Sequence, residues 1–142
     1  MTIESERLIG KSDWPTARRA WEEWWRGEGL ALHVTAPRDT PLWDVPPAEA
    51  PDLETQWLDP EYRLRAQERA IAGTYYGGVA FPMFDTQIGP GSLGLFLGCS
   101  GRLAESTVWY DRVIADPETH PPLRFEPAGE WWERHVRLIA AA

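Results

Sequence analysis

The stretch WEEWWRGEGLALHVTAP, residues 21–37, decides the fold class because it passes directly from a helical pattern to a strand pattern. Upstream of it, Asp13 can cap a helix and Pro15 suits a first helical turn. Apolar residues then recur at helical spacing until two glycines end the pattern. The sequence therefore predicts a helix over residues 13–27.

Residues 30–36 form the clearest predicted strand. Its apolar side chains alternate with smaller or polar ones, with Leu30, Leu32, Val34 and Ala36 on one face and Ala31, His33 and Thr35 on the other. Pro37 ends the run, as proline ends strands. A second helix is predicted from Asp59 and Pro60 to Ala72, before a glycine.

Residues 37–57 separate the predicted strand from the second predicted helix. Five prolines exclude a regular helix or central strand there, namely Pro37, Pro41, Pro46, Pro47 and Pro51. Loops of this length in compact domains are usually lids or binding loops when apolar side chains anchor them. We therefore expect a long, packed, functional loop.

The second half of the chain contains shorter predicted elements. They are a buried strand over residues 79–84, a loop and short helix over 89–98, strands at 107–110 and 123–125, and a last helix over 128–141. Helices that alternate with short apolar strands are typical of parallel βαβ folds. The predicted fold class is therefore α/β with a parallel sheet.

Composition limits the partners of the chain. The formal charge of −8 repels nucleic acid and anionic lipid, and no basic patch interrupts it. No apolar run is long enough for a membrane span, and the N-terminus lacks the apolar core of a signal peptide. We therefore expect a cytoplasmic protein that uses a small-molecule substrate and contacts neither nucleic acid nor membrane.

A known family is similar in the order of its motifs. WEEWWRGEGLALHVTAP, DPEYRLRAQERAIAGTYYGGVAFPMF, GPGSLGLFLGC and STVWY together resemble the opening of proteins of the uroporphyrinogen-decarboxylase-like superfamily. The resemblance implies that residues 1–142 are the N-terminal portion of a (β/α)₈ barrel. A complete barrel needs about 250 residues, so we expect the barrel to be incomplete in this chain and to leave open sheet edges through which the chain can self-associate.

The resemblance also implies an activity, the decarboxylation of a tetrapyrrole in porphyrin biosynthesis. A corrinoid-dependent methyltransferase of the same superfamily is the first alternative. The second alternative is a non-catalytic module in which the proline-rich loop captures a planar or carbohydrate ligand. We expect the isolated chain to be inactive as a decarboxylase, because many loops that would surround a substrate are missing.

Site candidates follow the predicted strands, where barrel enzymes place their catalytic groups. Asp85 matches by position the aspartate that binds pyrrole N–H groups in the decarboxylase, and it is the catalytic candidate. Substrate-binding candidates are Arg38, Asp39, Thr86 and Gln87. Arg38 suits a substrate carboxylate because guanidinium binds carboxylates in a bidentate manner.

Simpler structural roles compete with each of these site candidates. Asp85 can close a turn, and Arg38 can pair with Asp39 or Asp44 on the surface. A lone cysteine such as Cys99 is usually a small buried apolar residue, and a histidine within a strand, such as His33, usually belongs to the core. We expect no metal site and no cofactor. If Arg38 and Asp85 do not share a cavity, the binding module gains over the enzyme.

Overall fold

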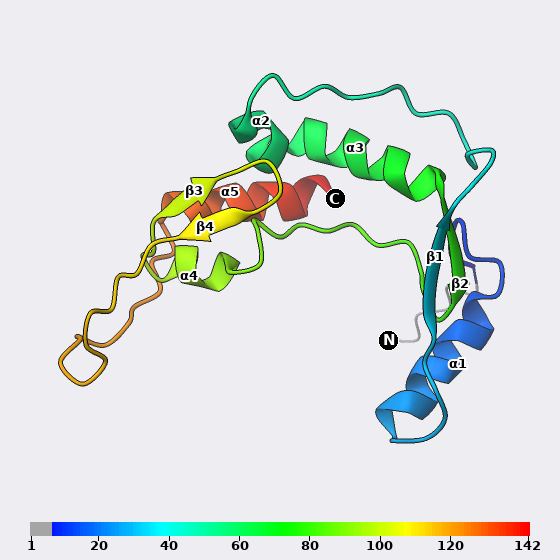
Figure 1. Cartoon of the computed structure of the whole chain (residues 1–142), viewed down its shortest axis with the longest axis horizontal. Helices are drawn as coiled ribbons and strands as arrows, with labels where there is room; N and C mark the ends of the chain where they lie inside the picture. Colours follow the sequence, from blue (N-terminus) through cyan, green and yellow to red (C-terminus); the bar gives the residue numbers. More distant parts are fainter. Residues whose placement is uncertain (1–6) are drawn as a thin grey trace. The chain divides into compact units, whose positions relative to one another are not determined.

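The computed structural model describes residues 7–142 (Figure 1). Within them the strands form two separate two-stranded sheets, and both sheets are antiparallel. The barrel prediction is therefore wrong, and so is the predicted parallel sheet. What remains of the predicted class is a small protein that mixes helices with strands.

The chain divides into two compact units. Unit 1 comprises residues 1–47 and 67–84, and unit 2 comprises residues 48–66 and 85–142. Helix α3 (Pro60–Ala72) contributes its first half to unit 2 and its second half to unit 1.

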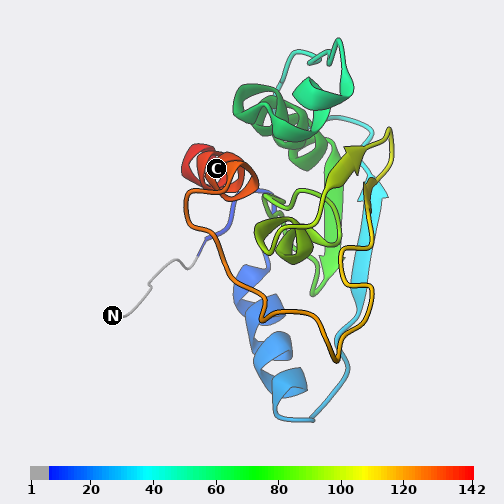
Figure 2. The same cartoon turned by 90° about the vertical axis from the view of Figure 1, so that its left-hand side faces the viewer.

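Unit 1 contains helix α1 (Trp14–Trp25) and the strands β1 (His33–Pro37) and β2 (Thr74–Gly78). Figure 2 shows the two strands side by side, and their register pairs Thr35 with Tyr76. The last strand residue, Pro37, pairs with Thr74. Helix α1 is joined to the segment after β2 because Trp21 Nε1 donates to the Val79 carbonyl at 2.9 Å.

The apolar run 79–84 is buried at its start without being a strand. Val79 and Ala80 are almost fully buried, and the Phe81 ring packs on the Trp14 ring at 5.3 Å between centroids. The strand lies one step earlier, in β2, so the predicted strand over 79–84 is wrong. Gly78, with φ +58°, turns the chain out of β2 at this point.

Unit 2 contains helices α2 (Leu53–Leu58), α4 (Ser92–Phe96) and α5 (Glu130–Ala141) and the strands β3 (Gly101–Leu103) and β4 (Val108–Tyr110). Its core consists of Leu58, Ile88, Leu95 and Leu138, with Trp57, Phe96 and Trp131 packed around them. The Tyr110 hydroxyl donates to the Ile88 carbonyl and accepts from the Gly91 amide, both at 3.0 Å. These bonds tie β4 to the turn before α4.

The structure corrects two further predictions. The segment 37–57 ends in helix α2, which Asp52 caps by accepting from the Thr55 amide at 2.7 Å. Residues 123–125 form no strand, and Leu123 and Phe125 are exposed.

The predicted N-cap of the second helix is confirmed. The Asp59 carboxylate accepts a hydrogen bond from the Tyr62 amide at 2.7 Å and so caps α3.

Candidate functional site

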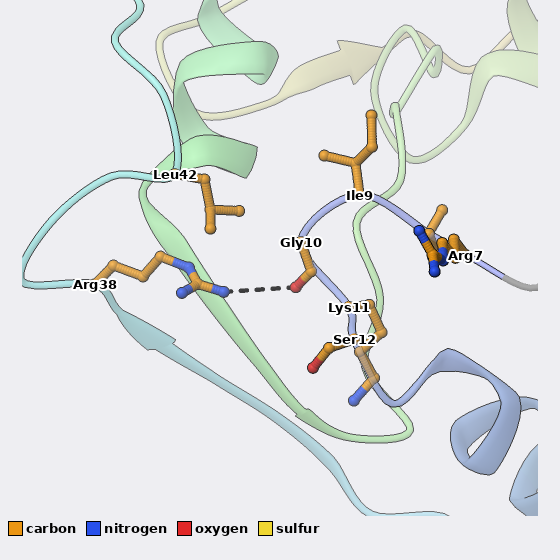
Figure 3. Close-up of a pocket in the computed structure, with 8 residues that line it drawn as sticks. Arg7, Ile9, Gly10, Lys11, Ser12, Arg38 and Leu42 are labelled. Carbon is orange, nitrogen blue, oxygen red and sulfur yellow. Dashed lines mark hydrogen bonds between the residues drawn. The ribbon is translucent and has the colours of Figure 1, made fainter.

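A cavity of about 590 Å³ lies in unit 1, and Figure 3 shows the side chains around it. Its lining consists of Arg7, Leu8, Ile9, Gly10, Lys11, Ser12, Arg38 and Leu42. The described lining thus combines three cationic side chains with three apolar ones and includes no acidic side chain. The lining is therefore positively charged, although the chain as a whole has a net charge of −8.

A tight turn at residues 8–11 forms one wall of the cavity. The Lys11 amide donates to the Leu8 carbonyl at 3.0 Å, and Gly10 has φ +80°. A Cβ at position 10 would lie 3.1 Å from Leu42 Cδ1. The positive φ favours glycine at this turn, and a Cβ there would also press on the end of the Leu42 side chain.

Lys11 anchors this turn to β2. Its Nζ donates to the Gly78 carbonyl at 2.7 Å and to the Tyr76 carbonyl at 3.1 Å, and it pairs with an Asp13 carboxylate oxygen at 3.0 Å. The side chain is fully buried. The ammonium group is thus occupied by protein acceptors, and its main role is structural.

Asp13 stands at the N-cap position of α1, but its side chain makes no capping hydrogen bond. The predicted cap is therefore wrong. The Asp13 carboxylate forms a salt bridge with the nearby Lys11 ammonium group instead.

Arg38 is the cationic group that the cavity leaves with spare donors. Its Nε donates to the Thr74 carbonyl at 2.9 Å and Nη2 to the Gly10 carbonyl at 3.5 Å (Figure 3), while the Tyr75 ring lies 5.7 Å from its Cζ. Within residues 7–142, Arg38 forms no salt bridge, so the predicted surface pair with Asp39 or Asp44 is not formed. No carboxylate of the described residues balances its half-buried positive charge.

The other predicted site residues are not part of this lining. Asp39 follows Arg38 but is exposed and does not line the cavity. Asp85, Thr86 and Gln87 belong to unit 2. Asp85 Oδ1 accepts from the Gln87 amide at 2.9 Å, which is the local turn contact that competed with a catalytic role.

Arg63 organises the backbone around Asp85 within unit 2. Its guanidinium donates to the carbonyls of Asp85 at 2.7 Å, Trp57 at 3.0 Å and Gln87 at 3.2 Å. Burial lowers the pKa of Arg63, and the charge of Asp85 opposes that shift. Guanidinium stays charged at any physiological pH, so these contacts persist.

A second cavity, of about 430 Å³, lies in unit 2 between α4 and the start of α5. Phe96, Cys99, Trp131 and Trp132 are among the residues that line it. The described residues contain no cluster of ligands able to hold a metal ion, and Cys99 is a free, partly buried thiol. His33 is exposed, so its predicted place in the core is wrong.

Sequence reasoning missed the turn at residues 8–11. Lys11 is the only lysine of the chain, and a single lysine near a terminus ordinarily indicates a solvated side chain. The one available signal was the sequence Gly10-Lys11, in which a glycine able to adopt positive φ precedes a long donor. That signal is weak without knowledge of the carbonyls that the lysine meets.

Comparisons with known proteins bring no relative. No protein-family model matches the sequence, no curated protein matches it, and no solved structure matches the fold. The resemblance to uroporphyrinogen-decarboxylase-like proteins therefore stays a prediction. Among the described residues, no helix combines the length and apolar character needed to cross a membrane.

Proposed function

We propose that this chain is a ligand-binding module whose unit 1 cavity takes a small amphipathic carboxylate. The observation that carries the proposal is the half-buried Arg38 guanidinium, which lines the cavity without a carboxylate partner among the described residues. A guanidinium with donors left over fits a carboxylate in a charge-assisted pair.

The remainder of the lining supports an apolar tail on the ligand. Ile9 and Leu42 are both exposed although they line the cavity. Covering such side chains with an aliphatic chain contributes about 25 cal/mol for each Å² of apolar surface removed from water. Ser12 supplies a hydroxyl that can donate to the second carboxylate oxygen.

The two enzymatic activities implied by the resemblance have less support. Both derive from a barrel that the chain does not form. The catalytic candidate Asp85 closes a local turn in unit 2, whereas Arg38 lines a cavity built from unit 1 residues. The binding module is therefore the better-supported alternative.

Calorimetric titration of the whole chain with hexanoate tests the proposal, with hexanol and acetate as comparison ligands. We expect hexanoate to bind more tightly than both, because hexanol lacks the charge and acetate lacks the chain. Arg38→Gln should weaken hexanoate binding about tenfold or more, since a charged hydrogen bond contributes about 1.5–3 kcal/mol. Arg38→Lys, which keeps the charge, should lose less.

Arg112→Gln is the matched control. Arg112 also donates to backbone carbonyls, those of Ile114 and Ala115, but it lies in unit 2 and outside both cavities. We expect its hexanoate affinity to equal that of the wild type. Equal binding of hexanol and hexanoate, or an unchanged affinity in Arg38→Gln, would contradict the proposal.

Decarboxylase activity is tested separately by incubating the purified chain with uroporphyrinogen III under reducing conditions in the dark. We expect no coproporphyrinogen above the uncatalysed rate, because Asp85 and Gln87 are engaged in their own turn. Formation of coproporphyrinogen above that rate would make decarboxylation the better-supported function.

A further inference from the structure

We propose that the free edge of β1 pairs with the same edge of a second copy of this chain, forming an antiparallel four-stranded sheet across a two-fold axis. Strand β1 has β2 as its only pairing partner within residues 7–142. All five of its residues are exposed. The other edge of β1 thus presents backbone groups to solvent, which is the situation that favours strand addition.

The hydrogen-bond pattern fixes which backbone groups face outward. The Val79 amide donates to the Leu32 carbonyl at 2.7 Å, and the Arg38 amide donates to the Gly73 carbonyl at 2.8 Å. In an antiparallel ladder such bonded pairs alternate, so Val34 and Ala36 also bond toward β2. The N–H and C=O groups of His33 and Thr35 therefore point to the free edge.

Pro37 lies at an outward-bonding position in the same alternation. Its missing N–H group falls on the free edge, so the ladder with β2 loses nothing. This placement explains how a proline occupies the last position of β1. It also shows that a proline is compatible with the outward positions of this strand.

One register satisfies the outward groups of two copies. With the two-fold axis at Val34, His33 of each chain lies opposite Thr35 of the other, and each such pair exchanges two hydrogen bonds. The two Val34 side chains then face each other as a non-hydrogen-bonded pair, where side chains are closest. Leu32 of each chain lies opposite Ala36 of the other.

Charge and exposure favour a second copy as the occupant. Strand β1 carries no acidic or basic side chain apart from His33, so pairing two chains of charge −8 here sets no carboxylates against each other. Leu32 and Val34, on one face, are 58% and 49% exposed, and the register places an apolar side chain of the second copy beside each of them. Apolar side chains thus meet apolar side chains.

The small size of the strand sets the expected strength. Stable complexes use about 20–30 residues on each side, whereas β1 offers five. We therefore expect a weak dimer that forms as the protein concentration rises and leaves the hexanoate site of each chain unchanged. Sedimentation velocity from about 10 µM to about 1 mM should show the sedimentation coefficient rising toward that of a dimer.

Thr35→Pro tests the edge directly. It removes an outward N–H group while every bond to β2 is retained, and Pro37 already shows that the strand accepts proline at such a position. We expect this variant to keep the wild-type circular dichroism spectrum and melting temperature but to stay monomeric over the whole range. Thr35→Val, which keeps the N–H group, should dimerise like the wild type.

Cross-linking tests the register without relying on the proline. In a Cys99→Ser background, Val34→Cys should form an intermolecular disulfide under mild oxidation, since opposed residues of a non-hydrogen-bonded pair have Cα atoms about 4.5 Å apart. Thr35→Cys should cross-link several-fold more slowly, because its counterpart is a diagonal neighbour about 7–8 Å away. A wild type that stays monomeric throughout, or equal cross-linking of the two cysteines, would overturn the proposal.

Discussion

Lys11 holds together three segments of unit 1 at the scale of a single residue. Its ammonium group binds the carbonyls of Tyr76 and Gly78 and the Asp13 carboxylate, and its side chain is fully buried. A buried ammonium group is tolerated only when acceptors surround it. The turn that forms one wall of the cavity therefore depends on this one side chain.

Lys11→Met should destabilise the protein by about 2–4 kcal/mol, because it leaves two part-buried carbonyls without their donor. Urea denaturation followed by tryptophan fluorescence measures the loss. The matched control is Arg18→Met on α1, because the side chains of Arg18 and of its salt-bridge partner Glu22 are both exposed. We expect that substitution to change stability by less than about 0.5 kcal/mol, and an equally small effect of Lys11→Met would contradict the structural role.

Gly78 and Gly27 form a second residue-scale pair. Both have positive φ, +58° and +77°, but a Cβ at position 78 would lie 2.1 Å from the Leu32 carbonyl oxygen, whereas one at position 27 would meet nothing within 4 Å. Gly27→Ala should cost only the strain of the left-handed conformation, about 1–2 kcal/mol. Gly78→Ala should cost clearly more, as measured by thermal melting. Equal costs would mean that β1 and β2 are not held as tightly as described.

At the scale of a single element, helix α2 is stabilised by a local N-cap, the side chain of Asp52. The Thr55 amide donates to the Asp52 carboxylate, and this bond is the main cause that lowers the pKa of Asp52 below its ordinary 3.8. Because the pKa of Asp52 is lower in the folded state, its carboxylate stabilises the protein at any pH above the ordinary pKa. That contribution is lost as the pH falls through the lowered value.

Asp52→Ala should therefore lower the melting temperature at pH 7, and the difference from the wild type should shrink once the pH falls below about 3.8. Thermal melts at a series of pH values measure this difference. Asp44→Ala is the control, because Asp44 is exposed and has no side-chain partner among the described residues. A gap between Asp52→Ala and the wild type that stays constant down to pH 2 would contradict the capping role.

Most helices were predictable from the sequence because their signals lie within a few residues, but α2 was missed because it lies in the segment where five prolines predicted a loop. Asp59 with Pro60 placed the start of α3 correctly, and glycine spacing indicated the short helix α4. Strand partners were not predictable, since β1 and β2 are separated by a long connection and nothing local shows that they pair antiparallel. The apolar run after Gly78 indicated burial correctly, but burial alone does not make a strand.

At the scale of the whole molecule, Arg38 is the one predicted site residue that lines the unit 1 cavity, and its role in binding stays a prediction. A guanidinium that follows a strand is visible in the sequence, and the structure places it in a cavity. The other members of that cavity come from the turn at residues 8–11, which reaches Arg38 only through the fold of unit 1. Asp85 was selected from the barrel topology, and in the observed fold its carboxylate accepts from the Gln87 amide in a local turn.

The unit 1 cavity is the proposed binding site for a small carboxylate. A ¹H–¹⁵N correlation spectrum recorded while the whole chain is titrated with hexanoate tests it most directly. We expect the shifting amides to be those of residues 8–12, Arg38 and Leu42, with residues 85–87 and the Cys99 cavity of unit 2 unchanged. Shifts confined to unit 2, or no shifts at saturating hexanoate, would contradict the account.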